Sequence, residues 1–95
     1  MKKISLDEFK GALPANSWFT VRHSSLSGAL ATRRAVRWDG DTLTVEIFPP
    51  RENAYSGEMH FASIDVYRKW TGVYFLMVGG EELHQILDIR QEWGG

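Results

Sequence analysis

Residues 31–48 read ATRRAVRWDGDTLTVEIF, and this stretch decides the fold that the sequence predicts. It holds two runs in which apolar and polar residues alternate, separated by Asp39-Gly40. An Asp-Gly pair between alternating runs is typical of a β-hairpin with a two-residue turn. With Asp39-Gly40 as the turn, the side chains expected on the core face are those of Val36, Trp38, Leu43, Val45 and Ile47.

The same register gives the three arginines of the first run different surroundings. Arg33 faces Glu46, and we expect a cross-strand ion pair between them. Arg34 lies at the edge of the core face, where its aliphatic stem can pack while its guanidinium reaches water. Arg37 lies on the opposite face together with Phe48 and has no expected partner.

The residues before this hairpin predict a short helix and a further strand. Ser5 is a suitable N-cap, and Glu8 three residues later completes a capping box. Pro14 is expected to end this helix. Residues 17–25 (SWFTVRHSS) have the composition of a strand whose side chains alternate between two faces. One face is expected to carry Phe19, Val21 and His23, and the other Trp18, Thr20 and Arg22.

The second half of the chain leaves two segments open between helix and strand. Residues 63–71 have a serine cap, basic residues near the end and a glycine after it, which favours a helix. Residues 81–93 are rich in leucine, glutamate and glutamine, and these good helix formers again favour a helix, although the residues also alternate. The apolar run GVYFLMVGG at 72–80 predicts a central strand buried on both faces, and GEMHF at 57–61 a short strand.

These elements predict a single α+β domain over residues 1–95. A mainly antiparallel sheet of about four to five strands would carry helices packed on one face. The alternative is a mostly β meander with one N-terminal helix, which follows if residues 63–71 and 81–93 are strands. Either sheet can leave its second face toward water.

Composition narrows the class of protein. The 95 residues include no cysteine, which excludes disulfides, thiolate nucleophiles and thiolate metal sites. The N-terminus lacks the apolar run of a signal peptide, and no stretch approaches the roughly 20 apolar residues of a membrane span. We therefore expect a cytoplasmic protein with no membrane partner.

The charge is distributed unevenly along the chain. The net charge is −1, but residues 1–38 carry seven cations and two anions, while residues 39–95 carry four cations and ten anions. The two halves either neutralise each other or form a basic and an acidic face.

No motif for catalysis, a metal or a cofactor is present, so we expect a non-enzyme that needs no cofactor. His23, His60 and His84 do not have short metal-ligand spacings, and neither a nucleophile elbow nor a phosphate-binding glycine loop occurs. We expect a non-catalytic protein–protein interaction module, such as a small cytosolic inhibitor or regulator of phage or immunity type. The alternatives are a nucleic-acid-binding protein that uses a basic, aromatic sheet face, and a homodimer through that face. The predicted partner-binding residues, of types common in protein interfaces, are Trp18, Arg22, Arg37, Phe48 and Tyr55.

Overall fold

The computed structural model describes residues 1–24, 28–48 and 57–91, with the side chain of Phe48 left out. In chain order the elements are β1 (Lys2–Ile4), α1 (Leu6–Ala12), β2 (Trp18–His23), β3 (Ala29–Asp39), β4 (Thr42–Phe48), β5 (Gly57–His60), β6 (Asp65–Trp70), β7 (Val73–Val78) and β8 (Glu81–Arg90). All described strands join one eight-stranded sheet in the order β1-β6-β7-β8-β2-β3-β4-β5. Each strand pair is antiparallel, and the pairing of β8 with β2 joins the two meanders β2–β5 and β6–β8.

The fold is therefore mainly β with one short helix in the described residues, and the expected layer of helices on one face is wrong. The helix favoured for residues 63–71 is strand β6, and the helix favoured for 81–93 is strand β8 as far as Arg90. Both strands are paired along both edges, β6 with β1 and β7, and β8 with β7 and β2. The ladder of hydrogen bonds on two sides outweighs a helix preference of a few tenths of a kcal/mol per residue.

Strand β7 was predicted correctly as an internal strand, but it is not buried on both faces. Tyr74 and Leu76 are buried, whereas Val73, Phe75 and Met77 are only half-buried. The run is continuously apolar because the side chains on its outer face are also apolar and are partly covered. It lies between β6 and β8, as a central strand should.

Helix α1 begins and ends where the sequence predicts. The backbone N–H of Glu8 donates to the Oγ of its N-cap Ser5 at 3.0 Å, and the helix ends at Ala12, two residues before Pro14. The helix presents Phe9, which is fully buried, to the core. This ring makes aromatic contacts with Trp38, Phe61 and Tyr74 at centroid distances of 6.2, 5.6 and 5.1 Å.

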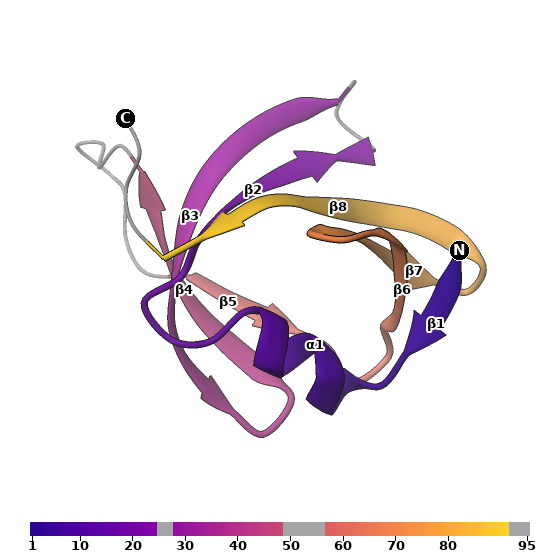
Figure 1. The fold of residues 1–95 in the computed structure, drawn as a ribbon, viewed down its shortest axis with the longest axis horizontal. Helices are drawn as coiled ribbons and strands as arrows, with labels where there is room; N and C mark the ends of the chain where they lie inside the picture. Colours follow the sequence, from indigo (N-terminus) through magenta and orange to yellow (C-terminus); the bar gives the residue numbers. More distant parts are fainter. Residues whose placement is uncertain (25–27, 49–56, 92–95) are drawn as a thin grey trace.

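The sheet is strongly curled, and α1 lies across its concave side (Figure 1). Register shifts in the pairs β3–β4, β6–β7, β7–β8 and β2–β8 mark bulges, which bend strands and increase their twist. The Nε1 of Trp38 donates to the carbonyl of Leu13 at 2.9 Å, and the Nζ of Lys10 donates to the carbonyl of Gly40 at 2.6 Å. These bonds hold the helix to strand β3 and to the β3–β4 turn. No helix in the described part of the chain has the length and apolar character to cross a membrane.

The β3–β4 hairpin forms as predicted, but its register differs. Asp39 pairs with Thr42, so the turn residues are Gly40 and Asp41, and Trp38 pairs with Leu43 rather than with Asp41. This shift of two residues keeps Trp38 and Leu43 on the core face, as expected. A bulge between Ala35 and Arg37 then adds one residue to β3. Because one extra residue inverts the facing of every side chain beyond it, the earlier residues of β3 face opposite to the prediction.

Candidate functional site

The bulge exchanges the roles of two arginines. Arg34, not Arg33, pairs with Glu46: its Nη2 lies 2.7 Å from Oε1 and its Nε 3.4 Å from Oε2. The Nη1 of Arg34 also donates to the side chain of Asn16 at 2.8 Å. Arg33 is instead opposite the fully buried Phe19 on β2, which places it on the concave side of the sheet. The predicted ion pair of Arg33 with Glu46 is therefore wrong.

Of the five residues predicted from the sequence to bind a partner, the structure describes the side chains of three, and it does not place Arg37 beside Trp18 and Arg22. Trp18 and Arg22 share the convex side of β2, as expected. Arg37 is exposed, but it lies seven residues along β3 from Leu30, the residue opposite Arg22, or about 23 Å of strand. Phe48 ends β4 opposite Thr32, and its side chain, like all of Tyr55, lies outside the described residues.

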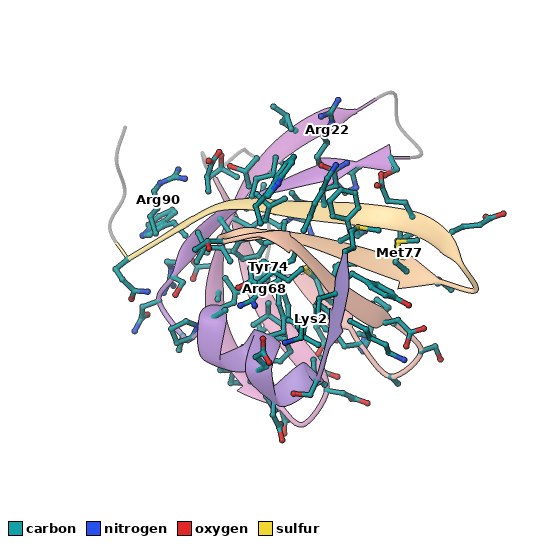
Figure 2. All side chains as sticks on the ribbon, turned by 45° about the vertical axis from the view of Figure 1, so that its right-hand side comes forward. Lys2, Arg22, Arg68, Tyr74, Met77 and Arg90 are labelled. Carbon is teal, nitrogen blue, oxygen red and sulfur yellow. The ribbon has the colours of Figure 1, made fainter. Side chains whose placement is uncertain are left out.

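The convex side of the β2–β3 hairpin carries a group of residues that we call the outer patch: Trp18, Arg22 and Leu30. Arg22 stands directly opposite Leu30, a residue that is 66 % exposed. Arg22 is exposed at the top of the molecule in the view of Figure 2, and its side chain makes no hydrogen bond or ion pair within the described residues. Its guanidinium lies over Gly28, where an added Cβ would come within 3.2 Å of Nε. Gly28 has a φ of 76°, a backbone conformation that glycine adopts without strain.

The concave side of the same hairpin carries a second group, which we call the inner cluster: Arg33, His23 and His84. The buried Nε of Arg33 has no hydrogen-bond partner, and its guanidinium forms no ion pair within the described residues. From Arg33 toward the β3 end at Ala29, the exposure of the residues on the concave side rises: Val21 is buried, Ala31 is half-buried and Ala29 is exposed. The inner cluster therefore lies where the concave side becomes accessible to water.

The two histidines of the inner cluster stand opposite each other. His23 on β2 pairs in register with His84 on β8, and their rings meet edge to face with centroids 4.6 Å apart. Burial lowers the pKa of His84, and the neighbouring His23 and the charge of Arg33 lower it further. Burial, and then Arg33, lower the pKa of His23 in the same way. The buried Nδ1 of His84 has no hydrogen-bond partner in the described residues.

Carboxylates near these strands are engaged elsewhere. Glu46 is held by Arg34, and Glu82 accepts hydrogen bonds from the hydroxyl of Ser24 and the amide of Gln85. Apolar residues face the inner cluster from the adjoining strands, Ile47 opposite Arg33 and Leu76 opposite His84. The inner cluster thus combines one permanent cation and two imidazoles, and none of the three forms an ion pair with a described acid. Across the described ranges, no group of three or more histidines, aspartates or glutamates could hold a metal ion.

Part of this arrangement could have been found in the sequence. The alternation of β2 correctly placed His23 on the face of Phe19 and Val21. The missing information was the pairing of β8 with β2, which joins residues 61 (His23 and His84) to 72 (Trp18 and Arg90) positions apart, and the bulge that turns Arg33 inward. Comparison of the chain with protein-family models, with curated proteins and with solved structures gave no match.

Proposed function

We propose that this protein is a non-catalytic binding protein that holds an acidic surface of a partner protein against its outer patch. The observation that carries the proposal is the pairing of Arg22, exposed and without a partner in the described residues, with the exposed Leu30. Trp18 lies on the same side of β2. Tryptophan and arginine are the residue types that most often dominate the binding energy of protein interfaces.

The positive charge of the outer patch indicates that the partner's surface is acidic. Arg22 has no acid of its own among the described residues, so a carboxylate on a partner can approach it without displacing an internal ion pair. A guanidinium binds a carboxylate through two parallel hydrogen bonds, which adds orientation as well as attraction. The neighbouring Leu30 supplies apolar area that is already exposed and gains from being covered.

A protein partner fits this face better than a nucleic acid. Nucleic-acid-binding surfaces commonly neutralise several phosphates at once, whereas the convex side of β2–β3 presents Arg22 and, about 23 Å along β3, Arg37. Arg34 on the same side is already bound to Glu46. The net charge of −1 also opposes binding to a polyanion.

The proposal is tested by affinity capture from the native host with four immobilised proteins: wild type, Arg22→Glu, Arg37→Glu and Arg33→Gln. We expect a protein retained by wild type and by the Arg37 and Arg33 variants, at least tenfold depleted with Arg22→Glu, and unaffected by nuclease. The purified partner should then bind wild type directly and more weakly as salt rises. Material that disappears after nuclease treatment would replace the proposal with nucleic-acid binding. A partner captured equally by Arg22→Glu would remove the outer patch as its site.

A further inference from the structure

The inner cluster leaves strong hydrogen-bonding groups unused. The Nε of Arg33 and the Nδ1 of His84 are both shielded from solvent, and neither has a partner in the part of the chain that the structure describes. Buried polar groups of folded proteins are nearly always hydrogen-bonded, and unpaired ones call for a specific explanation. The Nε of Arg33 is a donor that lacks an acceptor, and the Nδ1 of His84 is a donor or an acceptor according to the tautomer of the ring. Two such atoms in one cluster, one of them on a charged group, favour a ligand that bonds to the cluster.

We propose that the inner cluster binds the oxyanion group of a small molecule, a carboxylate or a phosphate, with Arg33 as the cation and the imidazoles of His23 and His84 as flanking donors. This inference concerns the concave side of the sheet and does not depend on the proposed function of the convex side.

The chemistry of the cluster selects an oxyanion over other ligands. A guanidinium is a planar fork of N–H donors that matches the paired oxygens of a carboxylate or phosphate. A neutral imidazole has one N–H donor and one acceptor, so each histidine can turn a donor toward the anion. The apolar neighbours Ile47 and Leu76 reduce competition from water and so strengthen the attraction.

Access to the cluster is consistent with a small ligand. His23 is half-buried, and the β3 residues beyond Arg33 on the concave side, Ala31 and Ala29, have small side chains and are increasingly exposed. Methyl groups at these two positions add little side-chain bulk between the guanidinium and the described end of β3.

The test is an NMR titration of the whole protein at pH 7 and constant ionic strength, with inorganic phosphate in one arm and acetate in the other. The imidazole Cε1–H signals of the three histidines and the Nε–H signal of Arg33 are followed. We expect saturable shifts of His23, His84 and Arg33 with a dissociation constant on the order of 1 mM, as suits a ligand of four or five non-hydrogen atoms. The exposed His60, on β5, serves as the internal control and should not follow the same curve.

Two variants complete the test. Arg33→Gln should weaken binding at least tenfold, while Arg37→Gln, which removes an exposed arginine from the same strand, should leave it unchanged. Saturation by phosphate alone, by acetate alone or by both supports the site and identifies its ligand. Linear shifts shared by His60, or wild-type affinity in a folded Arg33→Gln protein, would overturn it. If Arg33→Gln does not fold, the wild-type Arg33 Nε–H signal decides: an unmoved signal refutes the site.

Discussion

Replacement of Arg33 by methionine should make the protein more stable. Methionine keeps an unbranched stem of similar length but removes the guanidinium, whose buried Nε has no partner in the described residues. Desolvation of this unpaired charge disfavours the folded state, and burial accordingly lowers the pKa of Arg33. The residues opposite it, Phe19 and Ile47, would accept an apolar side chain.

The size of the effect follows from the partial burial of Arg33. Replacing fully buried ion pairs or triads by apolar side chains has stabilised proteins by about 1–4 kcal/mol. Arg33 is only half-buried, and water reaches part of its guanidinium, so the gain should lie near the lower end, about 1 kcal/mol. In a domain of 95 residues this corresponds to a rise in Tm of about 4–8 °C.

The assay is thermal and urea unfolding at pH 7.5 in a buffer free of phosphate and carboxylates. Arg37→Met is the matched control, because it makes the same chemical change at an exposed position and should stay within about 0.5 kcal/mol of wild type. The urea midpoint should rise for Arg33→Met without a change in m. A fall in Tm of several degrees would refute the reasoning, since it would mean that the guanidinium has a stabilising partner. The same result would remove the premise of the oxyanion site.

Three further predictions address the sheet and its charges. Asp88 has a φ of 52° at a bulge in β8. Asp88→Gly should therefore leave the free energy of unfolding nearly unchanged, while Asp88→Val should lower it by about 1–3 kcal/mol in urea unfolding. If residue 88 lay in a helix, the glycine would instead cost about 1 kcal/mol. A double-mutant cycle of Arg34→Ala and Glu46→Ala should give a coupling of about 1 kcal/mol, whereas a value near zero would contradict the bidentate pair. Because the pKa values of His23 and His84 are lowered in the folded state, the folded protein binds fewer protons than the unfolded chain below about pH 6.5. The contribution of these two neutral histidines to the free energy of unfolding is therefore complete above about pH 6.5 and is lost as the pH falls toward their lower folded pKa values. The Tm should therefore fall between pH 7 and 5, and substitution of both histidines by glutamine should flatten this dependence.

Local signals in the sequence predicted the local structure well. The capping box at Ser5 and the Asp-Gly pair needed only neighbouring residues, and both gave the correct element. Strand β8 could not be predicted in the same way, because its residues favour a helix and become a strand only through pairing with β7 and β2. Asp88 distinguishes the strand from the predicted helix, because its positive φ at the bulge is incompatible with a right-handed helix.

The candidate site was harder to predict than the fold for a related reason. The sequence indicated three arginines in β3, but their facing depends on the bulge between Ala35 and Arg37, which no residue type in that stretch announces. One inserted residue turned Arg33 from an expected surface ion pair into a cation on the concave side. Charge counts could not show this, because they record how many acids are present and not which strands bring them near.

The arrangement of the ion pairs explains why unpaired arginines gather on the β2–β3 hairpin. Charges of the basic first half and the acidic second half pair where elements of the two halves lie side by side, as in Lys3–Asp65 at 3.2 Å between β1 and β6. The hairpin contributes cations to both of its sides, but beyond β2 its neighbour is β8, whose Glu82 is engaged by Ser24 and Gln85. Arg22 on the convex side and Arg33 on the concave side are therefore left without described acids in a chain of net negative charge. Because the two arginines lie on opposite sides of the hairpin, substitution of Arg33 and Arg22 one at a time separates the two binding proposals.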